Sequence, residues 1–190
     1  MDEVRALATG RERPRIERDD DLAVAARSDP EAFGLLYERH RLAVFRYLRT
    51  RCWSDDDAGE LTAIVFERAL HAIPRYRPAG GGFVAWLLRI ARNASIDTHR
   101  RATAVQFAGD LSDTSSTGPE EDVLAHEARA SLLASVGDLP QIQREAIVLR
   151  YAAGLTAREI GEVLGKTDQA TQKLLSRALA SLRETYRDDI

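Results

Sequence analysis

The sequence predicts an all-α protein made of two helical domains that are joined by a flexible acidic linker. Apolar residues recur at helical spacing on both sides of a polar middle segment, and no stretch alternates as a strand does. The segment 102–122 is rich in Gly, Ser, Thr, Asp and Glu, a composition that buries too little apolar surface to fold alone. The chain has 190 residues, 44% of them hydrophobic, which is enough for a core on each side of this linker.

Four segments follow from this division. We expect a disordered extension over 1–18, a first domain over 19–101, the linker over 102–122 and a second domain over 123–187. Fully extended, the linker would reach about 70 Å. The two domains could therefore contact sites about two turns of DNA apart.

The first domain is expected to contain four helices. A short helix lies around Leu22, and a second one is capped by Asp29 with Pro30 at its first position. The acidic run 55–57 can cap a third helix, which prolines and glycines between 74 and 82 bring to an end. The fourth helix is expected from about Phe83 to Arg101. Its inner face would hold Phe83, Leu87, Ile90 and Ala94.

The second domain has the pattern of a helix-turn-helix. One helix begins at Pro140, and the next begins with a capping box formed by Thr156 and Glu159. Gly165 permits a left-handed exit into a tight turn, after which Thr167 or Asp168 can cap a long last helix. The buried seam of that helix would hold Ala170, Leu174, Ala178 and Leu182. Two residues depart from the usual pattern: helix-turn-helix motifs favour Ala at the position of Gly161 and an apolar branched residue at the position of Thr171.

The last helix carries the side chains that a DNA reader needs. Gln169, Gln172, Lys173 and Ser176 would face the bases of a major groove, where glutamine can bond an adenine edge. Lys166, Lys173 and Arg177 would contact phosphates. An ordinary helical hairpin in a small core is the alternative interpretation.

Charge is distributed unevenly along the chain. The net charge is -3, but residues 75–101 hold six Arg and one Asp, whereas residues 102–138 hold seven acids and one Arg. Tyr76, Phe83 and Trp86 accompany the basic segment. Arginines neutralise phosphates and aromatic rings stack on unpaired bases, so the segment indicates nucleic-acid binding. The alternative is that Phe83 and Trp86 belong to the core and the arginines form a solvated face.

Several other classes of protein are not favoured. The four histidines show no metal-ligand spacing, and the single Cys52 cannot form an internal disulfide. Residues 80–82 lack the Lys-Ser/Thr of a phosphate-binding loop. The longest apolar run has six residues, and no signal peptide is visible in residues 1–20. We therefore expect a cytoplasmic protein that is not an enzyme, with no catalytic residue, metal or cofactor.

The segment 83–97, Phe-Val-Ala-Trp-Leu-Leu-Arg-Ile-Ala-Arg-Asn-Ala-Ser-Ile-Asp, resembles the most characteristic part of the extracytoplasmic-function (ECF) sigma factors of bacterial RNA polymerase. Matches to their region two are Asp29–Phe33, Leu36-Tyr37, Glu60–Thr62 and Val65-Phe66. Matches to their region four are Leu139-Pro140, Arg144–Ala146, Leu149–Tyr151, Glu159-Ile160 and Leu175–Ala178. The resemblance covers residues 19–187 in the right order.

The resemblance implies that the protein binds core RNA polymerase, at its clamp and flap, and directs it to promoter DNA. An anti-sigma factor is implied as a further partner. The clamp would bind Glu60, Leu61, Thr62, Phe66 and Arg68. The minus-ten element would contact Tyr76, Arg77, Gly80, Gly81, Trp86, Arg89, Arg92, Asn93, Asp97, Arg100 and Arg101. The minus-thirty-five element would contact Lys166, Thr167, Gln169, Gln172, Lys173, Ser176 and Arg177.

Two alternatives belong to other functional classes. One is a helix-turn-helix regulator that acts without docking on polymerase, which run-off transcription with core polymerase would distinguish. The other is a partner-binding module that has lost DNA recognition, because the usual family run is replaced at residues 169–174. Initiation that depends on Gln172 and an upstream element would exclude that module.

Overall fold

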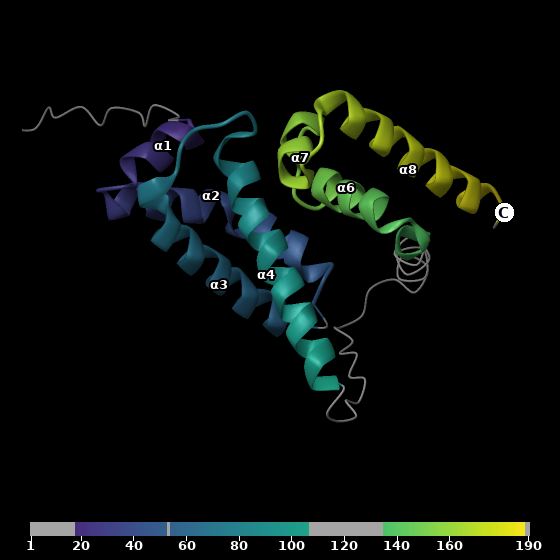
Figure 1. Ribbon diagram of the computed structural model, residues 1–190, viewed down its shortest axis with the longest axis horizontal. Helices are drawn as coiled ribbons and strands as arrows, with labels where there is room; N and C mark the ends of the chain where they lie inside the picture. The colour runs from purple at the N-terminus through teal and green to yellow at the C-terminus, as the bar shows by residue number, and fades with distance from the viewer. Residues whose placement is uncertain (1–17, 53, 107–134, 189–190) are drawn as a thin grey trace, which may run out of the picture.

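The computed structural model describes residues 18–52, 54–106 and 135–188, and every regular element in these ranges is helical. The all-α prediction is therefore confirmed. The first half contains α1 (Asp19–Ala25), α2 (Pro30–Arg49), α3 (Asp55–Ala72), the 3₁₀ turn η1 (Ile73–Arg75) and α4 (Gly82–Gln106). The second half contains α6 (Gln141–Tyr151), α7 (Ala157–Leu164) and α8 (Asp168–Asp188). Figure 1 shows the two groups of helices side by side, with α7 next to α4.

The helix starts of the first half follow the local sequence. The Asp29 side chain accepts a hydrogen bond from the backbone N–H of Glu31 at 2.9 Å, and Pro30 occupies the first position of α2. The predicted cap of α3 is wrong by one residue. Ser54 is the N-cap, its hydroxyl oxygen accepting from Asp57 N at 3.0 Å while the Asp57 carboxylate accepts from Ser54 N at 3.2 Å. The acidic run therefore does not provide the N-cap. It provides Asp57, the N3 residue of a capping box, whose carboxylate accepts from the N-cap backbone.

The fourth helix is longer than the sequence predicts. α4 continues to Gln106, five residues into the segment expected to be linker. Its inner face is confirmed at Phe83, Leu87 and Ala94, whereas Ile90 is only partly buried and Leu88 and Ala91 are fully buried. The structure does not describe the N-terminal extension before residue 18, the rest of the predicted linker or the first part of the second domain, residues 123–134.

The helix-turn-helix forms as the sequence predicts. Thr156 and Glu159 make both bonds of a capping box, at 3.3 Å from Glu159 N to the Thr156 hydroxyl oxygen and 2.7 Å from Thr156 N to the Glu159 carboxylate. Gly165 ends α7 with φ +66°, a conformation that favours glycine. Thr167 caps α8, since its hydroxyl oxygen accepts from Ala170 N at 3.2 Å.

One position of the predicted seam on α8 is wrong. Ala170 is exposed, and the neighbouring Thr171 is fully buried against Gly161 of α7. The seam therefore begins one residue later than its apolar pattern suggests. The Thr171 hydroxyl donates to the Thr167 carbonyl at 3.0 Å, so burial leaves no polar group unsatisfied.

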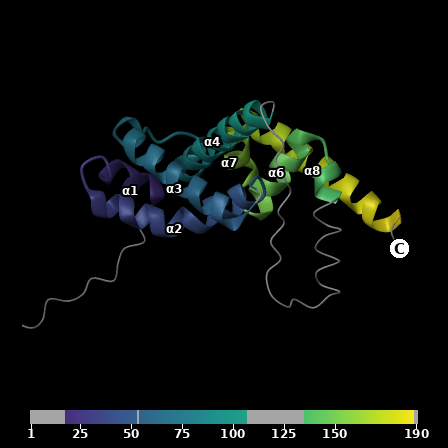
Figure 2. The same ribbon diagram turned by 90° about the horizontal axis from the view of Figure 1, so that it is seen from below.

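The two halves share a core. Buried Ala146, Leu149, Leu155 and Ile160 of the second half join the apolar cluster that is built on α1 to α4. A smaller cluster lies between α6 and α8, around Leu139, Ile147 and Ala178. The view in Figure 2, turned by 90°, also places α7 beside α4. The sequence predicts two separate bodies, whereas in this structure they pack directly on one another. None of the described helices combines the length and the apolar character needed to cross a membrane.

Candidate nucleic-acid interface

The predicted minus-thirty-five residues all lie on one accessible side of the helix-turn-helix. Lys166 and Thr167 are exposed in the turn between α7 and α8. The exposed face of α8 follows, and a shallow hollow on it is lined by Gln169, Gln172, Lys173, Ser176 and Arg177. The Gln172 amide donates to the Asp168 carboxylate at 3.2 Å. The side chains suited to base edges and phosphates are thus displayed together, away from the core.

The two unusual residues of this motif fit each other. A Cβ at Gly161 would lie 2.6 Å from the Lys166 carbonyl oxygen and 3.2 Å from the Thr171 hydroxyl oxygen. Lys166 N also donates to the Gly161 carbonyl at 2.8 Å, so the turn is tied to α7 at this point. The absence of a side chain at position 161 is what allows the turn to approach so closely.

Tyr76 begins the loop that the sequence assigns to the minus-ten element, and it is buried. Only 2% of the residue is exposed, and its ring packs on Trp86 and Phe83 with centroid distances of 5.1 and 5.8 Å. Burial raises the pKa of the Tyr76 hydroxyl, and the hydrogen bond that it donates to Asp20 at 2.5 Å raises it further. In this conformation Tyr76 shapes the loop and presents no ring to a base.

Asp20 holds the start of α4 in place. Its carboxylate accepts from Phe83 N at 2.8 Å as well as from Tyr76. Gly82, with φ +69°, turns the chain into the helix at this point. Sequence reasoning missed Asp20, because its partners are 56 and 63 residues away and no local pattern indicates them.

The other predicted minus-ten residues divide into exposed and covered groups. Arg77, Gly80, Arg89, Asn93 and Arg100 are exposed. Trp86 packs partly against the core, as the alternative interpretation of the sequence had it. Arg92 is paired with Glu145, Asp97 accepts from Arg68 at 3.5 Å, and Gly81 is buried. The side chain of Arg101 lies outside the described residues.

The face of α3 assigned to the polymerase clamp is only partly accessible. Glu60 and Arg68 are exposed. Leu61, Thr62 and Phe66 belong to the core, and the Thr62 hydroxyl donates to the Ala58 carbonyl at 2.7 Å. The exposed side of the same helix adds Ala63, Glu67 and Leu70, the last of which is 48% exposed. Sequence reasoning missed Leu70, although its spacing of seven from Ala63 puts it on the outer face.

Comparison with known proteins agrees with this geometry. The Sigma-70 region 2 family model matches residues 36–105, and the Sigma-70 region 4 model matches residues 129–182. These matches define a sigma factor of the sigma-70 class. Within that class the chain belongs to the ECF RNA polymerase sigma factors, because it is 34% identical to ShbA of Streptomyces griseus over 87% of this chain and 97% of that protein.

Two further relatives support the assignment. The ECF sigma factor BldN of Streptomyces coelicolor is also 34% identical, over 87% of this chain, which spans 64% of the length of BldN. The solved structure of CnrH in complex with the cytosolic domain of CnrY is 27% identical, with a TM-score of 0.68 over 90% of this chain and 99% of that chain. CnrH is an RNA polymerase sigma factor of Cupriavidus metallidurans.

Proposed function

We propose that this protein is an alternative sigma factor that binds core RNA polymerase and directs it to promoters which both of its halves contact. The observation that carries the proposal is that regions 2 and 4 occur in order in one chain, with the α8 face exposed. A regulator that acts without polymerase would account for the helix-turn-helix but would not need region 2. That alternative is not favoured.

Region 4 supplies recognition of the minus-thirty-five element. Its short α7 crosses the DNA backbone and the N-terminal part of α8 enters the major groove. Gln169 and Gln172 are positioned to bond base edges, whereas Lys166, Lys173 and Arg177 neutralise phosphates. Only the contacts of the two glutamines with bases distinguish one DNA sequence from another, because phosphates are the same in every sequence.

Region 2 supplies recognition and opening of the minus-ten element. Exposed Arg77, Arg89 and Arg100 hold the phosphates of the displaced strand, and Asn93 contacts a base edge. The loop from Tyr76 to Gly82 receives an extruded base. Opening requires no covalent chemistry and no cofactor: binding of the extruded base offsets the few kcal/mol that unstacking costs.

Polymerase and an anti-sigma protein are the proposed partners. The polymerase clamp docks on the exposed side of α3 around Glu60 and Arg68, and the flap contacts region 4. The relative CnrH forms a complex with the cytosolic domain of CnrY, which supports a protein partner for this chain. The protein acts in the cytoplasm, where it meets the polymerase.

Run-off transcription followed by sequencing of the transcripts tests the function. Core polymerase with the purified protein should initiate at start sites that core polymerase alone ignores, and the upstream sequences should share two elements. The variant Gln172→Ala should weaken the dependence of initiation on the upstream element while dependence on the minus-ten element is kept. Failure to form a complex with core polymerase, or an unchanged set of start sites, would reject the proposal.

A further inference from the structure

One carboxylate oxygen of α1 binds both ends of the loop 76–82, which connects η1 to α4. Asp20 Oδ1 accepts from the Tyr76 hydroxyl at 2.5 Å and from the Phe83 backbone N–H at 2.8 Å. A negative charge at the start of a helix also interacts favourably with the helix dipole. Asp20 therefore acts as a cap of α4 although it lies 63 residues before Phe83 in the sequence.

A second bond to the same loop comes from the other end of α1. Arg27, just after this helix, donates to the Tyr76 carbonyl, which also accepts from the Arg77 guanidinium at 2.9 Å. The Nε of Arg27 is buried, and no residue that the structure describes accepts a hydrogen bond from it. Because a buried donor without a partner costs stability, the bond to the loop explains the position of Arg27 better than a gain in stability does.

The helix that carries these two residues is itself fixed to the rest of region 2. Leu22 and Ala23 of α1 are buried in the shared core, with 2% and 0% of each residue exposed. The Asp19 carboxylate accepts from Arg39 at 2.9 Å and lies 2.8 Å from the Nε2 atom of His40, both in α2. Asp20 and Arg27 therefore hold the loop from a support that packing and ion pairs keep in place.

The residues that Asp20 holds shape the surface proposed to receive an extruded base. Tyr76, Gly82 and Trp86 line a hollow of about 40 Å³ between the loop and α4. Tyr76 is bonded to Asp20 directly, and a Cβ built on Gly82 would lie 3.5 Å from Asp20 Oδ1. A change at Asp20 therefore alters two walls of this hollow at once.

We propose that Asp20 and Arg27 are positioning residues for the minus-ten element, which fix the loop 76–82 in the conformation that discriminates the extruded base. This inference rests on the proposed function, since it concerns the same loop. Asp20 acts through Tyr76 and Phe83, and Arg27 acts through the Tyr76 carbonyl. A loop that is ordered before binding loses less conformational entropy when the base enters, so more of the contact energy remains for discrimination.

The first experiment measures hydrogen–deuterium exchange of the full-length protein by mass spectrometry. Asp20→Ala removes both bonds, whereas the amide oxygen of Asp20→Asn still has two lone pairs to accept them. The control Asp21→Ala makes the same change at an exposed neighbour in α1. Peptides covering 76–83 should exchange about tenfold faster in Asp20→Ala and close to the wild-type rate in the other two variants. Wild-type exchange in Asp20→Ala would refute the positioning role.

The second experiment measures base discrimination by the holoenzyme. Its DNA is a labelled fork junction that carries the minus-ten element of a start site mapped with the wild-type protein, with each base of the displaced strand replaced in turn. The wild-type holoenzyme should bind about tenfold more weakly when the base received by the loop is replaced. Asp20→Ala and Arg27→Ala should lose this difference at that one position and keep the preferences at the others, and Asp20→Asn should restore most of it. A merely destabilised domain would lose affinity for all of these DNAs alike.

Tyr76→Phe provides the same test if Asp20→Ala does not fold. It removes the hydroxyl that Asp20 binds and keeps the ring that packs on Phe83 and Trp86, so it should lose part of the discrimination at the same position. Full base preference in a folded Asp20→Ala or Tyr76→Phe holoenzyme would refute the inference and leave the proposed function intact. Absence of initiation by the wild-type holoenzyme would instead reject the proposed function, while the exchange rates would still decide whether Asp20 holds the loop.

Discussion

Replacement of Gly161 by alanine should destabilise the protein, although alanine is the better helix former. The added Cβ would meet the Lys166 carbonyl oxygen at 2.6 Å, and that backbone cannot retreat easily because Lys166 N is bonded to the Gly161 carbonyl. Overpacking of this kind costs about 1–3 kcal/mol, against a gain of about 0.5–1 kcal/mol from helix propensity. We expect a net loss of about 1–2 kcal/mol, which lowers the Tm by about 2–8 °C in a chain of this size.

Gly34→Ala is the matched control for this prediction. Gly34 lies in α2, and a Cβ there has nothing within 4 Å. Only the propensity gain applies, so its Tm should rise, by about 1–4 °C. Thermal melts followed by circular dichroism compare both variants with wild type. If Gly161→Ala melts at or above the wild-type temperature while Gly34→Ala is stabilised, the close approach at the turn does not govern the stability of this motif.

Three further predictions concern a helix cap, a tyrosine and the α8 face. Thr156→Ala removes the capping box of α7 and should cost about 1 kcal/mol, measured by urea unfolding. Burial raises the pKa of the Tyr76 hydroxyl above 10, its value in the unfolded chain. The stability that this hydroxyl contributes is therefore complete below pH 10 and is lost as the pH rises above it. In thermal melts from pH 9 to 11, the difference in stability between wild type and Tyr76→Phe should become smaller. In assays of holoenzyme binding to promoter DNA, Lys173→Ala should reduce by about 1 the slope of the logarithm of the binding constant against the logarithm of the salt concentration. Gln172→Ala should instead relax the base preference at one position of the upstream element.

The features that the sequence predicts correctly are local ones. The bonds of the Thr156–Glu159 capping box and of the Asp29 cap join residues two or three positions apart, so residue types and spacing suffice to identify them. The exposed face of α8 can be predicted in the same way, because polar residues at helical spacing lie on the side opposite the buried apolar seam. Where the local prediction failed, at Ser54 and Ala170, it was wrong by one residue, because packing fixes the rotation of a helix and its exact start.

For the predicted polymerase-binding and minus-ten residues, only the structure shows which are buried in the core and which are accessible to a partner. Motif resemblance cannot distinguish a residue that builds the domain from one that touches a partner. Leu61 and Phe66 are core residues of α3, and Tyr76 is held by Asp20 beneath the loop. Their roles in binding stay predictions. Exposed residues such as Glu60, Arg68 and Arg89 can be tested by substitution without disturbing the core.

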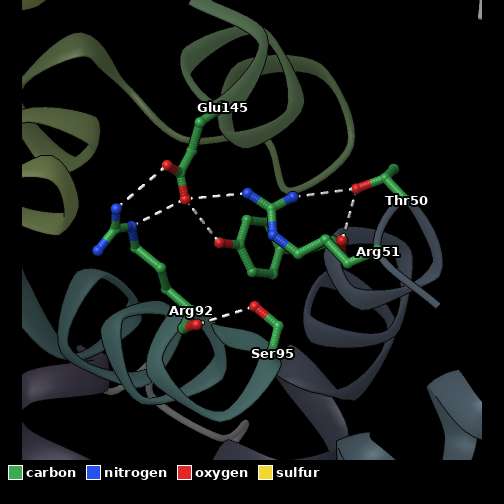
Figure 3. Close-up of polar contacts among 6 residues, drawn as sticks. Thr50, Arg51, Arg92, Ser95 and Glu145 are labelled. Atoms are coloured by element: carbon green, nitrogen blue, oxygen red, sulfur yellow. Dashed lines mark hydrogen bonds and ion pairs between the residues drawn. The ribbon is translucent and has the colours of Figure 1, made fainter. Parts of the chain in front are cut away.

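The sequence by itself determined the helical class and most of the exposed face of α8, because both depend on periodicity and on bonds between near neighbours. The order of regions 2 and 4 followed from the resemblance of its motifs to the sigma-factor family. Only the tertiary structure decided that region 4 lies on region 2. Glu145 meets Arg51 and Arg92 across 94 and 53 residues, and a charge pattern does not indicate which carboxylate will neutralise which arginine. That choice depends on the packing of α6 and α7 against α4, which brings two half-buried arginines to a buried carboxylate (Figure 3).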